Sequence, residues 1–75
     1  MTLITLDLTG VVCPINFVRT KLKLETMSVG EELQVLLDDG EPIESVTKSI
    51  LEEGQLIVSK TRSGDHWRLL IRKSR

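Results

Sequence analysis

The chain has 75 residues, a net charge of −1 and a hydrophobic share of 40%. A chain of this length forms one domain, spanning residues 1–75, and its core is too small to enclose a large substrate cavity. We therefore expect it to act through its surface or to insert a reactive group into a partner's active site. The near-neutral charge gives no general attraction to nucleic acid or membranes, so we expect no direct contact with either.

The number of cysteines limits which disulfide, redox and metal sites the chain can form. The single cysteine, Cys13, excludes an internal disulfide, a paired-cysteine redox motif and a multi-cysteine zinc site. We accordingly expect no metal and no cofactor. No apolar run reaches the length of a membrane span, and the apolar start of the chain lacks the basic residues of a secretion signal. These features favour the cytoplasm, where a free thiol persists.

The first predicted elements are a strand and a helix. Apolar and polar residues alternate over residues 3–8, which predicts a half-buried strand with Ile4, Leu6 and Leu8 on one face. Pro14 favours the first helical position, so we expect a helix from there to about residue 28, ended by Gly30.

The first predicted helix has apolar residues on two nearly opposite sides. One stripe holds Phe17, Leu24 and Met27 with Thr20 between them, and the other holds Ile15, Val18 and Leu22. Only one stripe can face the sheet of a two-layer domain. The other stripe either meets a second helix or remains exposed beside the cysteine.

The remaining chain predicts a strand, a helix and a hairpin. We expect strands over residues 32–37, 56–61 and 67–73, with a hairpin turn at residues 63–65. The second helix begins at Pro42 and ends at Gly54. Its predicted core residues are Ile43, Val46, Ile50 and Leu51, and the inward residues of the last strand are Trp67, Leu69 and Ile71.

The predicted order is therefore β-α-β-α-β-β. It corresponds to an α+β two-layer sandwich in which two helices cover one face of a four-stranded mixed sheet. The turn at residues 38–41 contains carboxylates without the spacing of a calcium loop, so we interpret it as a solvated turn.

Cys13 lies between the first predicted strand and the first predicted helix. Gly10 permits a tight turn before it, and Pro14 after it places Cys13 at the predicted N-cap. The free N–H groups and the dipole of the helix start favour a thiolate. Three interpretations remain open: a buried structural cysteine, a dyad with His66 as base, and an activated sulfur that needs no base. We favour the third.

These features together resemble the TusA/SirA-like family of small sulfurtransferases. The resemblance spans nearly the whole chain and rests on several motifs. They are Leu8-Thr9-Gly10, Val11-Val12, Cys13-Pro14, Val29-Gly30-Glu31, Asp38-Asp39 and Leu70-Ile71-Arg72-Lys73.

The resemblance implies a sulfur carrier. Cys13 would accept sulfane sulfur as a persulfide from a donor protein of the cysteine desulfurase or rhodanese type, and Pro14 would be its structural companion. The sulfur would then pass to an acceptor protein of a sulfur relay, for example toward thiolation of tRNA. We expect a monomer. The alternatives are a protein-interaction module that has lost the relay and a redox-sensing thiol.

Two further residues need interpretation. The family motif is Cys-Pro-x-Pro, but here its fourth position is Asn16. Asn16 either bonds back to the N-cap as in a capping box or is a tolerated surface residue. His66 lies beside a predicted turn, where a histidine is mostly exposed and inert.

Overall fold

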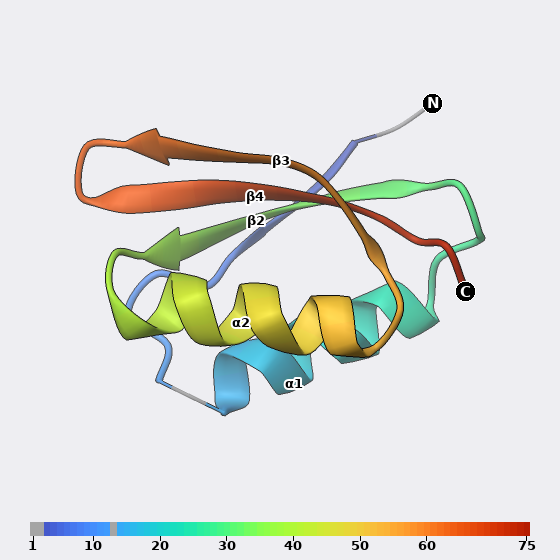
Figure 1. Cartoon of the computed structure of the whole chain (residues 1–75), viewed down its shortest axis with the longest axis horizontal. Coiled ribbons are helices and arrows are strands. Elements are labelled where there is room, and N and C mark those ends of the chain that lie inside the picture. Colours follow the sequence, from blue (N-terminus) through green and yellow to red (C-terminus); the bar gives the residue numbers. More distant parts are fainter. Residues whose placement is uncertain (1–2, 13) are drawn as a thin grey trace.

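A computed structural model describes residues 3–12 and 14–75. These residues form β1 (Ile4–Asp7), α1 (Ile15–Glu25), β2 (Glu32–Asp38), α2 (Glu41–Glu52), β3 (Leu56–Ser63) and β4 (His66–Arg72). The strands make one sheet in the order β1-β2-β4-β3, and both helices lie on one face of it (Figure 1). The predicted two-layer sandwich with a mixed sheet is confirmed.

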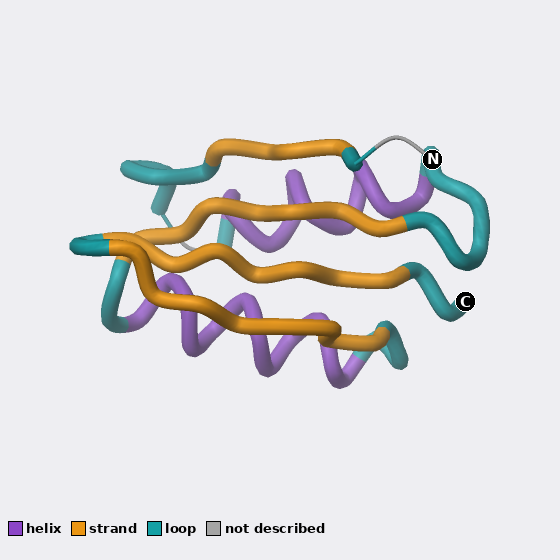
Figure 2. The backbone as a smooth tube through the Cα atoms, turned by 90° about the horizontal axis from the view of Figure 1, so that it is seen from above, coloured by secondary structure: helices purple, strands orange, loops and turns teal. Residues whose placement is uncertain are grey.

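The connections bring three turns to one end of the sheet. β1 and β2 are parallel, while β4 pairs antiparallel with both β2 and β3. Figure 2 shows the four strands side by side, with the two helices running beneath them from that end. The β1–α1 loop, the β2–α2 turn and the β3–β4 hairpin turn all lie there. We call this the loop end of the molecule.

The core fills the space between the sheet and the helices. Side chains alternate across β2, so that Leu33, Val35 and Leu37 are fully buried, as the sequence pattern predicts. Each such side chain contributes about 1.5–3 kcal/mol to folding through the apolar area that it removes from water. The core residues are Leu8, Leu24, Met27, Leu33, Val35, Leu37, Ile43, Val46, Ile50, Leu69 and Ile71.

The second helix matches its predicted stripe except at one position. Ile43, Val46 and Ile50 are buried, but Leu51 is 55% exposed. The prediction for Leu51 was wrong because one helical residue is a rotation of about 100°, which turns Leu51 away from the face that carries Ile50. Gly54 follows the helix with a φ of +84°, the left-handed conformation that a glycine at a helix end accepts without strain.

The first helix is shorter than predicted at both ends. Its N-cap is Pro14, not Cys13, and its C-cap is Thr26. The Thr26 hydroxyl donates to the Lys23 carbonyl oxygen at 2.7 Å and closes the last turn. Gly30 does not end the helix. It lies in the turn before β2, where its N–H donates to the carbonyl oxygen of Lys73 beside β4.

Candidate functional site

The β1–α1 loop is shaped by hydrogen bonds within the loop end. Leu8 is buried and its carbonyl oxygen accepts the N–H of Val11 at 3.1 Å, which turns the chain away from the sheet. Gly10 takes part in this turn with a φ of +79°, where an L side chain would be strained. Cys13, the predicted site residue in this loop, lies outside the described residues.

Asp38 at the end of β2 anchors this loop. Its Oδ2 accepts the backbone N–H of Gly10 at 2.7 Å, a contact between residues 28 positions apart. The interpretation of the turn at residues 38–41 as merely solvated was therefore incomplete. The predicted parallel pairing of the first two strands places their carboxyl ends at the same edge of the sheet, but no local sequence pattern identifies the contact itself. Asp38 fixes where the loop leaves that edge.

The described residues on both sides of Cys13 already follow helical hydrogen bonding. The Val12 carbonyl oxygen accepts the N–H of Asn16 at 3.2 Å, and the Pro14 carbonyl oxygen accepts that of Val18 at 3.0 Å. The first turn of α1 contains no acidic residue. The start of α1 is thus a region of partial positive charge that no nearby carboxylate on the same turn opposes. Such a position favours an anion over its neutral form.

Asn16 is the largest departure from the sequence prediction in this region. It is fully buried, so it is neither a surface residue nor a side chain that reaches back to cap the helix. Its Oδ1 accepts the N–H of Phe17 at 2.7 Å. Its Nδ2 is buried and has no hydrogen-bond partner within residues 3–12 and 14–75. An unpaired buried donor of this kind costs about 1–3 kcal/mol.

The buried side of α1 is also polar one turn after Asn16. Thr20 is also fully buried, and its hydroxyl donates to the Asn16 carbonyl oxygen at 2.9 Å. Further along the helix the same face becomes apolar with Leu24 and Met27. Phe17, which the sequence assigned to this face, is only half-buried and packs against the edge of the core. The polar part of the inner face therefore lies at the loop end.

The second apolar stripe of α1 is exposed to solvent. Ile15, Val18 and Leu22 are 46%, 45% and 59% exposed. They project from the helix on the side away from the core, and α2 does not cover them. Of the two placements that the sequence left open, exposure beside the β1–α1 loop is confirmed. Apolar side chains grouped in this way are candidates for contact with another protein.

A shallow hollow of about 350 Å³ lies next to the same loop. Its lining residues are Gly10, Val11, Val12, Asp38, Glu41 and Pro42. Val12 is 70% exposed on its rim. The hollow joins the β1–α1 loop to the first turn of α2. It is too open to enclose a substrate, which agrees with the expectation that so small a domain acts through its surface.

His66, the alternative base for Cys13, lies at the start of β4. Its Nδ1 is 3.4 Å from Oδ1 of Asp65, and its register partner on β2 is Asp38. Across the sheet, hydrogen bonds from the Thr9 hydroxyl and N–H, with a smaller effect of His66, hold the pKa of Asp7 below its usual value. All of these groups near His66 are carboxylates, and none of the contacts tests a dyad with Cys13, which lies outside the described residues.

The second turn carboxylate, Asp39, fastens the hairpin to the β2–α2 turn. Its Oδ1 accepts the indole N–H of Trp67 at 2.8 Å, and its Oδ2 pairs with Arg62 at 3.1 Å. The Trp67 hydrogen bond, with a smaller effect of Arg62, lowers the pKa of Asp39. Lys60 and Arg62 lie over the Trp67 ring, 5.2 and 5.9 Å from its centroid. This cluster holds the turns of the loop end together.

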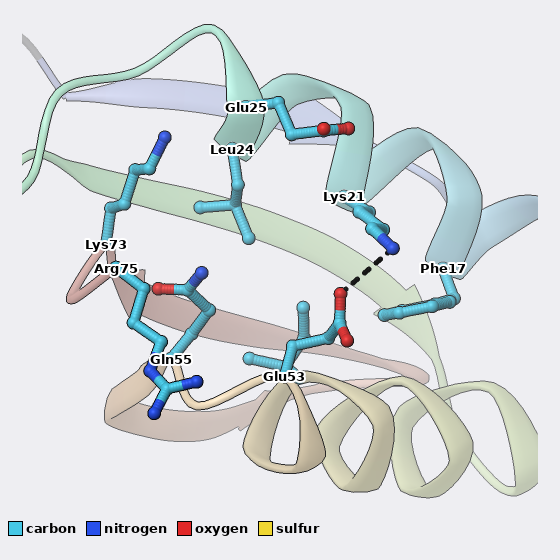
Figure 3. A pocket seen from close by; sticks show the side chains of 9 residues that line it. Phe17, Lys21, Leu24, Glu25, Glu53, Gln55, Lys73 and Arg75 are labelled. Carbon is cyan, nitrogen blue, oxygen red and sulfur yellow. Dashed lines mark ion pairs between the residues drawn. The ribbon is translucent and has the colours of Figure 1, made fainter.

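A groove of about 190 Å³ separates the two helices toward their far ends (Figure 3). Leu24, Ile50 and the half-buried Phe17 provide its apolar walls. Lys21 and Glu53 point toward one another across it, with Nζ and Oε1 3.1 Å apart. Because both side chains are exposed, this ion pair adds little to stability. The groove belongs to the packing of the helices and lies away from the β1–α1 loop.

Within the described residues, no three or more His, Cys, Asp or Glu side chains gather as metal ligands. Among the same residues, neither helix is long and apolar enough to cross a bilayer.

Comparison with known proteins decides the family. A family model described as "Sulfurtransferase TusA" matches residues 4–73. The chain belongs to the TusA sulfurtransferase family. This match covers the β1–α1 loop, both helices and all four strands. The family resemblance that the sequence motifs predicted is therefore confirmed.

Two archaeal proteins resemble the chain along most of its length. Both are named "Putative sulfur carrier protein". One, from Archaeoglobus fulgidus, is 42% identical over 69 residues, which cover 91% of this chain and 78% of the relative. The other, from Methanocaldococcus jannaschii, is 32% identical over 68 residues, which cover 91% of each.

A solved structure with the same architecture supports the fold. It is the crystal structure of a SirA-like protein from Desulfitobacterium hafniense, which superposes with a TM-score of 0.81 and covers 96% of this chain and 99% of that one. Its sequence is 24% identical. The two chains thus share the sandwich of two helices on a four-stranded sheet.

Proposed function

We propose that this protein is a sulfur carrier that holds sulfane sulfur as a persulfide on Cys13 and passes it to a partner protein. The observation that carries the proposal is the TusA family match over residues 4–73, which includes the Cys13-Pro14 pair at the start of α1. The names of the two archaeal relatives point the same way. The exposed surface around this loop suits a protein that delivers sulfur into another protein's site.

The proposed loading step is a thiol–persulfide exchange. The Cys13 thiolate attacks the outer sulfur of a persulfide on the donor. A bond forms between Sγ of Cys13 and that sulfur, the S–S bond of the donor breaks, and its electron pair leaves with the donor as a thiolate. No external oxidant or reductant is needed. Delivery repeats the same exchange with an acceptor thiolate as the attacking group.

The start of α1 supports this chemistry electrostatically. Both forms of the sulfur on Cys13, the thiolate before loading and the persulfide after it, are anions, and the dipole at the N-terminus of a helix stabilises anions. The first turn of α1 has no acidic residue to oppose them. The protein therefore needs to supply little more than placement and local positive potential, and no general base is required.

We assign donor docking to the exposed stripe of Ile15, Val18 and Leu22. Ile15 is in the first turn of α1, where a donor has to approach Cys13, and it is 46% exposed. Arg19 and Lys23 flank the stripe and favour a partner with acidic residues around its own sulfur site. The proposed donor is a cysteine desulfurase or a rhodanese. The proposed acceptor is a further protein of a sulfur relay, and thiolation of tRNA is one possible use of the sulfur. We propose that the carrier acts in the cytoplasm.

The test of the proposal is sulfur loading of the purified chain. We expect incubation with a persulfide donor to add one sulfur atom to the intact mass, and reductant to remove it. The added atom should map to the peptide that contains Cys13. A chain that gains no sulfur would be the interaction module considered above. A chain that forms only mixed disulfides with the donor would be a redox-sensing thiol. Either result would contradict the carrier function.

A further inference from the structure

Two surfaces of different character flank the β1–α1 loop. One is the exposed apolar stripe of α1, proposed for donor docking, with the basic residues Arg19 and Lys23 beside it. The other is the hollow of about 350 Å³ between the loop and the first turn of α2, which is lined by the carboxylates of Asp38 and Glu41. The two surfaces therefore carry opposite charges although they share the same loop.

The negative charge of the hollow is not neutralised by the described residues. Among them, neither Asp38 nor Glu41 forms an ion pair with a lysine or an arginine. Oδ2 of Asp38 accepts the N–H of Gly10 at 2.7 Å, a contact that shapes the loop and leaves the charge in place. The imidazole of His66, opposite Asp38 on β4, lies 3.4 Å from the carboxylate of Asp65. The hollow thus presents two carboxylates that a cation from outside the molecule can reach.

Apolar side chains form the rest of the hollow. Val12 is 70% exposed on its rim, and Val11 and Pro42 are half-buried along its lining. Aliphatic side chains beside carboxylates suit a partner segment that combines an apolar residue with basic ones. Because the hollow is shallow and does not enclose a small molecule, the occupant that it fits is an exposed segment of another protein.

The charge difference separates the two partners that a carrier needs. A sulfur carrier meets a donor and an acceptor in turn, and both have to approach the same loop. A partner with acidic residues around its sulfur site fits the stripe beside Arg19 and Lys23, but the carboxylates of the hollow repel it. A partner with basic residues has the opposite preference. The two charges therefore direct two different partners to different sides of the loop.

We propose that the hollow is the docking site of the acceptor protein, which presents an apolar side chain and basic residues next to its own cysteine. This inference rests on the proposed carrier function and deepens it by assigning the charge of the acceptor. The apolar side chain contacts Val12 and Pro42, and the basic residues pair with Asp38 and Glu41. In the delivery step the acceptor thiolate bonds to the outer sulfur of the persulfide, and the carrier cysteine leaves as a thiolate.

The test compares sulfur delivery to two short peptides that each contain one cysteine and one leucine. Lysines flank these residues in the basic peptide, and glutamates flank them in the acidic peptide. The ratio of the two delivery rates is divided by the same ratio measured with glutathione persulfide, which corrects for the different reactivities of the peptide thiols. We expect the corrected ratio to favour the basic peptide about fivefold, as for one or two exposed ion pairs. A ratio of one, or a preference for the acidic peptide, would overturn the proposal.

Two variants in the first turn of α2 form a matched pair. Glu41→Gln removes a carboxylate that lines the hollow, and Glu44→Gln removes an exposed carboxylate that does not. Both lose a similar interaction with the start of the helix, so effects on stability are comparable. The preference for the basic peptide should fall about threefold in Glu41→Gln and stay close to that of the wild type in Glu44→Gln. Equal falls would overturn the assignment, because the effect would then come from the general charge of α2.

A binding measurement makes the proposal independent of sulfur chemistry. With serine in place of its cysteine, the basic peptide at millimolar concentration should shift the backbone amide NMR signals of Val11, Val12 and Glu41, and not those of Val18 and Leu22. Absent shifts, or shifts confined to the stripe, would overturn the docking site even if the wild type loads sulfur. A chain that binds the peptide in the hollow but gains no sulfur would keep the docking site and contradict the carrier function.

Discussion

The two helices begin at the same end of the sheet and cover the same face, yet their side chains are sorted in opposite ways. α2 buries Ile43, Val46 and Ile50 and has the acidic residues Glu41 and Glu44 in its first turn, as expected for a helix built for stability. The inner face of α1 begins with two buried polar residues, its outer face carries exposed apolar ones, and its first turn is without acids.

The difference teaches where the functional constraints lie. Departures from stabilising patterns concentrate at functional sites, because the requirements of a site compete with those of folding. In α1 three departures meet in or near the first turn: buried Asn16, exposed Ile15 and the missing acidic residues. In α2 the first turn is acidic and the fully buried side chains are apolar, although the hydroxyl oxygen of Thr47 is buried without a hydrogen-bond partner among the described residues. The comparison therefore supports a site at the start of α1, independently of the family match.

The largest effect is expected from the residue that precedes α1. Cys13→Ser should abolish sulfur loading completely, since an alcohol does not form a persulfide, and should leave the fold intact, because serine is small and favoured near helix starts. Intact mass after loading and circular dichroism check the two parts. Loss of the fold in this variant would mean that Cys13 is a structural core residue.

The next effect contrasts the inner face of α2 with the outer face of α1. Ile50→Ala should lower the free energy of unfolding by about 2–5 kcal/mol, because Ile50 is only 1% exposed. Leu22→Ala should change it by less than about 0.5 kcal/mol, since Leu22 is 59% exposed. Urea denaturation measures the free energy of unfolding of both variants. If Ile50→Ala does not fold, the smaller truncation Ile50→Val measures the effect at this position.

Equal destabilisation by these two variants would contradict the contrast between the helices. Sulfur loading of the folded fraction provides the complementary measurement. Ile50 lies away from the β1–α1 loop, so the folded Ile50→Val variant should load sulfur as the wild type does.

Much of this arrangement follows from the sequence, because local periodicity reports which face of an element is apolar. The alternation in β1, β2 and β4 and the spacing of Ile43, Val46 and Ile50 identified the core correctly. Leu51 shows that an apolar residue type alone does not predict burial, because a residue one position away from the buried stripe of a helix faces solvent.

The details of the site are less accessible, for two physical reasons. Asn16 lies four residues before Thr20 and eight before Leu24, so helical spacing places it on the buried face, but a polar side chain argues for the surface unless its partners are known. Asp38 binds Gly10 across 28 residues, and local patterns carry no information on such a contact. Only the parallel pairing of β1 and β2 brings the two together.

A smaller effect is expected at the proposed docking stripe. Ile15→Gln removes an exposed apolar contact without adding charge near Cys13. Transfer from a protein donor should fall about fivefold, as for loss of about 1 kcal/mol at an interface, while loading from a small-molecule persulfide continues. The free energy of unfolding should change by less than about 0.5 kcal/mol.

The matched control for this docking prediction is Leu51→Gln on α2. Leu51 is 55% exposed, comparable to Ile15, but it lies at the far end of its helix from the loop. Its variant should transfer sulfur as fast as the wild type. Equal slowing by the two variants, or no slowing by Ile15→Gln, would reject the stripe as the donor surface.

The smallest effect comes from giving α1 the acidic first turn that α2 has. Ile15→Glu places a carboxylate near the positive end of α1, where it interacts favourably with the helix by about 0.3–1 kcal/mol. The same charge opposes a nearby anion, so the pKa of the Cys13 thiol should rise by about 0.2–0.7 unit from a wild-type value below the roughly 8.5 of a free thiol. Alkylation rate against pH measures both values. High salt should reduce the difference, because the charges are exposed and screened. A wild-type midpoint at or above that of a free thiol, or a shift downward in Ile15→Glu, would show that the start of α1 does not control the ionisation of Cys13.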